Sequence, residues 1–219
     1  MATVYSIAGY DGYIGRRAET SWTDSRDNTT GTHTGRTTTK YLAGMRAFHF
    51  PARGGGASWR VFRSFLRFDT SGISEAPSSA TLKVYGYSRN SADIFAVKAT
   101  HSLEFTNADF DAITGWNNSG VDNESNVTKY SSEITSWSTS GYNDIALNAT
   151  ALSDMASLDD FKICLIESVH DLRNVEPSSE TSYESGMYYS DQSGTSYDPY
   201  VDYTAAVGAD NATFFGANF

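Results

Sequence analysis

The chain is poor in cysteine, proline and basic residues, and each shortage excludes a class of protein. Its 219 residues include 1 cysteine and 4 prolines. One cysteine cannot form a disulfide within the chain, which excludes a small fold held together by disulfides. Lys and Arg total 16 against 26 Asp and Glu, so the formal net charge is −10. We therefore expect no nucleic-acid partner, because phosphate backbones attract proteins of the opposite charge.

Long apolar runs are also absent from the sequence. No segment approaches the roughly 20 consecutive apolar residues of a membrane-spanning helix. The N-terminal Met-Ala-Thr-Val-Tyr lacks the basic residues and the apolar stretch that begin a secretion signal. We expect no membrane partner, and synthesis in the cytoplasm without a signal peptide.

The residues that are abundant favour strands and turns. Aromatic residues make up 14% of the chain, with 14 Tyr and 12 Phe, while charged residues make up only 19%. Tyr, Phe, Val, Ile and Thr are typical of strands, whereas long helices need more Ala, Leu, Glu and Lys. The lone Cys164 lies in the apolar run 161–166. We expect it to be a small buried apolar side chain and not a nucleophile.

Two segments, 59–69 and 79–88, alternate between apolar and polar residues. On a strand, successive side chains point to opposite faces of the sheet. The first segment places Phe62, Leu66 and Phe68 on one face, and Arg63, Phe65 and Arg67 on the other. The second segment places Ala80, Leu82 and Val84 opposite Thr81, Lys83 and Tyr85. Two apolar faces bury each other by stacking about 10 Å apart, which leaves tyrosine-rich outer faces for contacts.

The remaining pattern predicts an all-β fold over residues 1–204. Further strands are expected at 39–50, 93–99, 142–148, 161–168, 187–191 and 199–204. Short helical turns are expected at 107–114, capped by Thr106 or Asn107, and at 148–155. Because the closing strand lies far along the chain from the first, we predict one jelly-roll-like β-sandwich domain of two antiparallel sheets. A long polar loop or frayed hairpin is expected at 18–38, facing water, and a second polar loop at 117–131.

Three segments carry a resemblance to a known family. They are Arg-Ser-Phe-Leu-Arg-Phe-Asp at 63–69, Ser-Ser-Ala-Thr-Leu-Lys-Val-Tyr at 78–85 and Ser-Asp-Gln-Ser-Gly-Thr-Ser-Tyr-Asp-Pro-Tyr-Val-Asp-Tyr at 190–203. Together with Tyr-Asp-Gly-Tyr-Ile at 10–14 and Ala-Ile-Thr-Gly-Trp at 112–116, they resemble the DNRLRE or carbohydrate-binding-module-like jelly-roll domain. That domain occurs in virion structural proteins of tailed bacteriophages. The resemblance spans most of 1–204 and implies a place on the virion exterior, after synthesis in the host cytoplasm.

The function that this resemblance implies is attachment without catalysis. The chain is then a capsid-decoration or fibre subunit that binds other virion structural proteins. It forms a homo-oligomer, either a trimer or an array bound to a capsid lattice. The alternative is a carbohydrate-binding module or receptor-binding tip that recognises a host-surface glycan. In that interpretation Trp116 and Trp137, which polar residues flank, are the candidates for stacking on sugar rings.

No constellation in the sequence supports an enzyme. The 4 histidines are widely separated, and no further metal ligands accompany them. The carboxylate pairs Asp109/Asp111 and Asp159/Asp160 are candidates for a catalytic cleft or a calcium site, but loop and cap roles fit them equally. We expect no catalytic residue, no metal and no cofactor, with calcium as the one alternative left open.

The segment 205–219 differs from the rest of the chain. It follows the closing strand with small residues and then carries Phe214, Phe215 and Phe219. Burying each phenylalanine is worth roughly 1.5–3 kcal/mol. We expect this tail either to fold back on its own sandwich or to dock into a neighbouring subunit through the three phenylalanines, with disorder as the third alternative.

Overall fold

The alternating segments form two long strands, β5 (Ala57–Asp69) and β6 (Ser79–Asn90). They belong to a computed structural model that describes residues 1–51, 57–178 and 180–206. The other strands are β1 (Ala2–Tyr5), β2 (Gly12–Glu19), β3 (His33–Gly35), β4 (Lys40–Pro51), β7 (Ile94–Lys98), β8 (Tyr142–Ala146), β9 (Asp160–Glu167), β10 (Ser182–Tyr188) and β11 (Tyr200–Thr204). The helical segments are α1 (Trp22–Arg26), α2 (Ala149–Ser157), the 3₁₀ turn η1 (Asn107–Asp109) and the π turn η2 (Ser168–Leu172).

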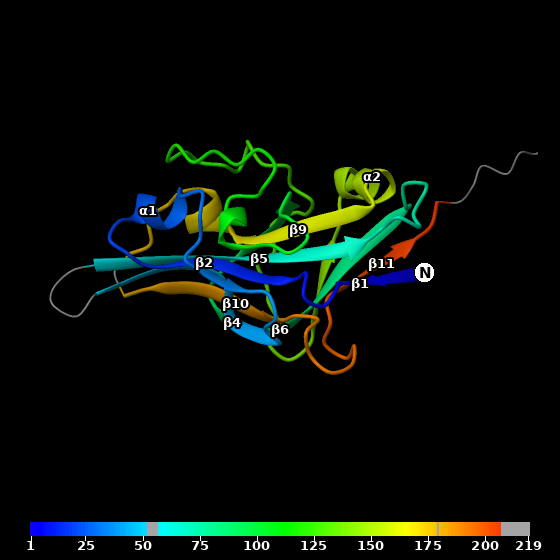
Figure 1. Cartoon of the computed structure of the whole chain (residues 1–219), viewed down its shortest axis with the longest axis horizontal. Helices are drawn as coiled ribbons and strands as arrows, with labels where there is room; N and C mark the ends of the chain where they lie inside the picture. The colour runs from blue at the N-terminus through cyan, green and yellow to red at the C-terminus, as the bar shows by residue number, and fades with distance from the viewer. Residues whose placement is uncertain (52–56, 179, 207–219) are drawn as a thin grey trace, which may run out of the picture.

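The strands form an all-β, jelly-roll-like sandwich, as the sequence predicts. All pairs between these strands are antiparallel. One layer has the order β1-β11-β6-β8. The other has the order β10-β4-β5-β2-β3, and β9 and β7 extend it from the second half of β5. Figure 1 shows β1 and β11 at the end of the molecule opposite α1.

The strand β6 belongs to both layers. Its residues 79–85 pair with β11 and β8, whereas Gly86, Ser88 and Arg89 pair with β10. Gly86 marks the change of partner, and a side chain there would collide with the carbonyl of Ser138. The sheet is therefore continuous from one layer to the other through a single strand.

A first core fills the space between the layers. Leu82, Val84 and Val201 from the first layer and Leu66, Phe68 and Ile163 from the second are fully buried in it. Of these, Leu66, Phe68, Leu82 and Val84 are apolar positions that the alternating patterns predict. The prediction that the strand at 199–204 closes the sandwich is confirmed, because β11 pairs with both β1 and β6.

A second core covers the opposite face of β5, β9 and β7. Val61, Phe65, Cys164 and Ile166 are buried there, under the segment that follows β7 and under α1. Figure 1 shows this segment and α1 above β5 and β9, on the side away from β4, β6 and β10. The prediction that Cys164 is buried is confirmed. β5 therefore buries both of its faces, and Arg63 and Phe65 do not lie on an outer surface.

One sequence-based prediction about the polar loops is wrong. The segment 18–38 was expected to face water, but it contains α1, which buries Trp22, Ser25 and Arg26. The segment 117–131 is a loop, as predicted, and it buries Val127 and Tyr130. The helical turn at 107–114 is confirmed, because η1 begins after Thr106, whose hydroxyl accepts a hydrogen bond from Ala108 N. The short helix at 148–155 is also confirmed, as α2, with Asn148 as its N-cap.

Candidate binding surface

Seven tyrosines lie together on the outer side of β6 and of the strands beside it, β1, β8, β10 and β11. We call this set the tyrosine surface: Tyr5, Tyr85, Tyr87, Tyr142, Tyr188, Tyr197 and Tyr200. Strand alternation places the strand residues there, because Val84, Ile145, Met187 and Val201 on the same strands point into the first core. Tyr197 lies on the loop between β10 and β11. The tyrosine-rich outer face that the sequence predicts is thus present.

The rings of the tyrosine surface form one connected series. Tyr5 and Tyr200 have ring centroids 5.4 Å apart, and Tyr200 and Tyr142 are 5.1 Å apart. Tyr142 contacts Tyr85 at 5.2 Å, edge to face. Tyr85 in turn contacts Tyr188 at 5.5 Å and Tyr197 at 4.6 Å, both edge to face. Each such contact is worth about 0.5–1.5 kcal/mol beyond burial of its area, so the rings hold one another in place.

Cross-strand register explains why these rings meet. Tyr5 stands opposite Tyr200, and Tyr85 stands opposite Tyr142, in the antiparallel pairs β1–β11 and β6–β8. Directly opposed side chains lie about 4.5–5.5 Å apart at Cβ. Tyr5, Tyr87 and Tyr197 remain 43%, 38% and 39% exposed. The paired strands therefore hold the series in place, and the exposed rings are open to a partner.

The electrostatics of the tyrosine surface are close to neutral. Lys83 forms an ion pair with Asp144 at 2.6 Å. Lys40 Nζ lies 4.3 Å from the ring centroid of Tyr87, a cation–π contact. Burial, followed by the nearby Tyr200 and Asp198, raises the pKa of Tyr142 to about 12, so its hydroxyl stays protonated. That hydroxyl donates to the carbonyls of Ser196 and Asp198, each at 3.2 Å. The surface offers apolar rings and hydroxyl groups with little net charge.

A buried ionic network lies in the second core, away from this surface. Arg63 donates two hydrogen bonds of 2.8 Å to the carboxylate of Asp171, from Nε and Nη2. Its Nη1 donates to the Phe110 carbonyl at 2.8 Å. Arg26 Nη2 donates to the Val121 carbonyl at 2.9 Å. These bonds fasten the segment that follows β7 to β5, so the network supports the fold.

The structure places the two predicted glycan-stacking tryptophans in different surroundings. Trp137 is 7% exposed, and its indole N–H donates to the Gly186 carbonyl at 3.1 Å. Trp116 is half-buried, and the guanidinium carbons of Arg63 and Arg26 lie 4.0 and 4.8 Å from its ring centroids. Neither lies in the tyrosine surface. Sequence reasoning noted outer tyrosines but did not single them out, although Tyr85 and Tyr87 show the alternating spacing.

The structure also bears on the predicted docking residues, on Asp109 and on candidate metal ligands. The docking candidates Phe214, Phe215 and Phe219 lie outside the described residues, so that expectation stays a prediction. Asp109 caps η1, and its carboxylate accepts hydrogen bonds from the backbone N–H groups of Ser102 and Thr106 at 2.8 Å. Within residues 1–51, 57–178 and 180–206, no three His, Cys, Asp or Glu side chains cluster as metal ligands. Over the same ranges, no helix has the length and apolar character needed to cross a membrane.

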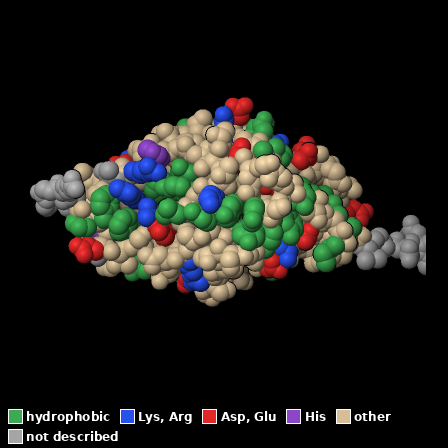
Figure 2. Space-filling view, turned by 90° about the horizontal axis from the view of Figure 1, so that it is seen from below, with side chains coloured by type: hydrophobic (Ala, Val, Ile, Leu, Met, Phe, Trp, Pro, Cys, Tyr) green, Lys and Arg blue, Asp and Glu red, His purple; other side chains and the backbone are tan. Residues whose placement is uncertain are grey.

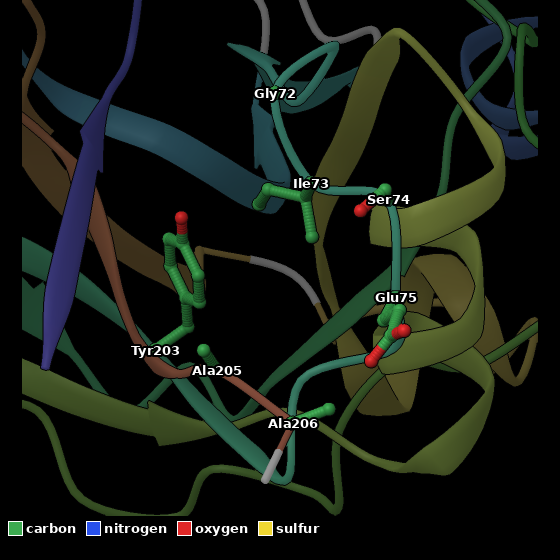
Figure 3. Close-up of a pocket in the computed structure, with 7 residues that line it drawn as sticks. All are labelled: Gly72, Ile73, Ser74, Glu75, Tyr203, Ala205 and Ala206. Atoms are coloured by element: carbon green, nitrogen blue, oxygen red, sulfur yellow. The ribbon is translucent and has the colours of Figure 1, made fainter. Parts of the chain in front are cut away.

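A small hollow lies where the chain leaves β11. Figure 3 shows Ile73 and Tyr203 on opposite sides of it, with Glu75, Ala205 and Ala206 nearby. Its volume of about 180 Å³ is below the roughly 300–1,000 Å³ of typical small-molecule sites. The hollow is a surface depression between a turn and a strand end and lacks paired catalytic groups.

Comparison of the sequence with protein families and with curated proteins found no match. No protein-family model matches the chain, and no curated protein is similar to it in sequence.

Proposed function

We propose that the chain is a non-enzymatic structural protein on the exterior of a tailed-phage virion. In this role it is a capsid-decoration or fibre subunit, and the tyrosine surface binds neighbouring virion proteins. The tyrosine surface is the observation that carries the proposal. Tyrosine is enriched at protein interfaces because it provides a large apolar area and a hydroxyl at a low entropic cost.

The arrangement of the surface supports binding rather than chemistry. All its rings except that of Tyr197 sit on paired strands, and the rings contact one another, so little side-chain freedom remains to be lost when a partner binds. The sequence resemblance of residues 63–69, 78–85 and 190–203 to domains of phage structural proteins supports the location of the partner on a virion.

Incorporation into particles tests this proposal. The tagged chain is expressed in infected cells, and particles are separated on a density gradient. We expect the parent protein to sediment with the particles and the double variant Tyr87→Glu and Tyr197→Glu to remain at the top, because charged side chains oppose an apolar interface. Leu103→Glu is the matched control, since Leu103 is 45% exposed and lies outside the tyrosine surface. A parent protein that never sediments with particles contradicts the proposal.

Glycan binding is the second candidate function. The exposed rings of Tyr5, Tyr87 and Tyr197 favour it, because sugar rings stack on open aromatic faces. A glycan array probed with the parent protein, the Tyr87→Glu and Tyr197→Glu variant and Trp116→Ala separates the candidates. Binding that the tyrosine variant loses would place the glycan on the tyrosine surface. Binding that only Trp116→Ala removes would place it at Trp116, and no binding would leave protein attachment.

A further inference from the structure

A second surface, rich in arginine, lies on the layer that contains β4 and β5. We call it the arginine face: Arg17, Arg46, Phe48, Phe50 and Arg60. Figure 2 shows basic and hydrophobic side chains gathered toward the left end of the face seen there. It shares no residue with the tyrosine surface and does not depend on the function proposed above.

Strand register places these side chains together. Phe48 of β4 stands opposite Arg60 of β5, and Arg46 stands opposite Phe62. Directly opposed residues of an antiparallel pair share a face of the sheet. Arg17 of β2 joins them, because its guanidinium carbon lies 5.2 Å from the Phe62 ring centroid and its Nη2 donates to the Tyr41 hydroxyl at 2.8 Å. Three neighbouring strands thus each contribute one arginine.

The positive charges on the arginine face exceed the negative ones. Glu184 of β10 forms an ion pair with Arg46. The guanidinium of Arg60 has no acidic partner or hydrogen-bond acceptor among the described residues, and its Nε is buried without one. Burial, followed by repulsion from Arg46 and Arg17, lowers the pKa of Arg60. An anion at this face would relieve that repulsion, although the chain as a whole carries a net charge of −10.

The phenylalanines orient the guanidinium groups for such an anion. The Arg60 guanidinium carbon lies 4.2 Å from the Phe50 ring centroid, and that of Arg46 lies 5.1 Å from Phe48. The two rings are themselves stacked at 5.2 Å. Arg46 already pairs with Glu184 and donates from Nε to Ser182 Oγ at 3.3 Å. Arg60 has no such partner among the described residues, so the N–H groups at the edge of its guanidinium can match the two oxygens of a carboxylate. Beside them the rings offer an apolar surface.

We propose that the arginine face binds an extended, acidic peptide segment of a partner protein. A carboxylate of the segment would pair with Arg60, the positive charge of Arg46 and Arg17 beside it would attract further acidic residues, and apolar side chains would pack on Phe48 and Phe50. Strands lie about 4.8 Å apart, so the face is only about 10 Å wide across β2, β5 and β4. A narrow segment stays within it, whereas a broad acidic surface would meet the excess negative charge of the rest of this chain within a Debye length of about 8 Å.

Selection from a random peptide library tests the proposal. The displayed peptides are selected on the full chain and on the Arg46→Gln and Arg60→Gln double variant. We expect parent-selected peptides to contain several Asp or Glu residues next to an apolar one, and to bind the double variant at least about tenfold more weakly. Arg60→Lys keeps the positive charge but loses the paired N–H donors of the guanidinium, so it should weaken binding by less than the double variant does. Binding should also fall as salt rises.

The control for loss of charge is the double variant Arg36→Gln and Arg89→Gln, which leaves the arginine face intact. Thermal unfolding of each variant checks that it is folded. Selected peptides without an acidic excess would overturn the proposal, and so would equal binding to the arginine-face variant and the control variant. Polygalacturonate and oligothymidylate serve as competitors. If either binds the arginine face more tightly than the selected peptides, the partner is a polyanion of that class and not an acidic peptide.

Discussion

At the scale of single residues, burial sets the charge state of several groups that sequence alone would treat as solvated. Asp11 is fully buried, and its Oδ2 accepts hydrogen bonds from Ser6 Oγ at 2.9 Å and from Ser190 N at 3.0 Å. Its Oδ1 has no partner among the described residues. Burial raises the pKa of Asp11 to about 7. Burial also lowers the pKa of His101 to about 3, so this imidazole is neutral near pH 7.

The raised pKa of Asp11 predicts how stability depends on pH. The folded chain holds this proton more tightly than the unfolded chain, whose Asp has a pKa of about 3.9. The stabilisation is therefore complete below about pH 4 and is lost as pH rises to about 7. The side chain of the Asp11→Asn variant cannot ionise, so the variant should lose no stability at this position as pH rises from about 4 to 7. We expect its stability relative to the parent to rise by up to about 1.4 kcal/mol per pH unit between about pH 4 and 7.

Urea unfolding of both proteins at several pH values measures this difference. Contributions of other groups, including Glu167, whose pKa burial raises to about 7, and His101, are common to both proteins and cancel. A constant difference between the two proteins across the window would show that Asp11 is ionised throughout.

At the scale of elements, the sequence predicted strands better than it predicted what covers them. Alternation identified β5, β6 and their inward residues, because the first core requires one apolar face from each. It did not show that Arg63 is buried, because an arginine on the second face of a strand ordinarily faces water. Only the fold brings Asp171 from η2 to within 2.8 Å of it. The strand predicted at 187–191 is observed at Ser182–Tyr188. Its first half is polar and gave no strand signal, because the partner that pairs with Glu184, Arg46 of β4, is distant in the sequence.

The tyrosine surface was predictable in outline only. Tyr85 could be placed on an outer face from alternation within β6, but its neighbours Tyr5, Tyr142 and Tyr200 come from three other strands. The order of those strands in the sheet is a property of the whole chain. The arginine face was missed because Arg17, Arg46 and Arg60 meet only through the pairing of β2, β5 and β4.

Gly86, where β6 passes from one layer to the other, gives a prediction about stability. Gly86→Ala would bring a methyl group against the Ser138 carbonyl, and backbone there must shift to accept it. We expect a loss of about 1–3 kcal/mol in the free energy of unfolding, measured by urea denaturation. Gly72→Ala is the matched control, because a methyl group there meets no atom within 4 Å. Equal stability of the two variants would contradict a tight fit at Gly86.

At the scale of the whole molecule, the two layers share one strand and both cores share β5. We therefore predict that residues 1–204 unfold in a single cooperative transition, as one domain does. Circular dichroism, tyrosine fluorescence and calorimetry should give coincident midpoints. Two separated transitions would show that the second core and its covering segment unfold independently of the sandwich.

The continuity of β6 has a mechanical consequence for a protein that is attached at its surface. A force applied to the tyrosine surface acts on residues 79–85, and the same strand continues into the β10–β4 sheet, which adjoins the arginine face. Load would pass along the backbone of β6 and then through the backbone hydrogen bonds to β10 and β4, without relying on side-chain packing between the layers. A subunit tethered at both surfaces would thus transmit tension through its paired strands, and the two layers need not slide past each other for that load to pass.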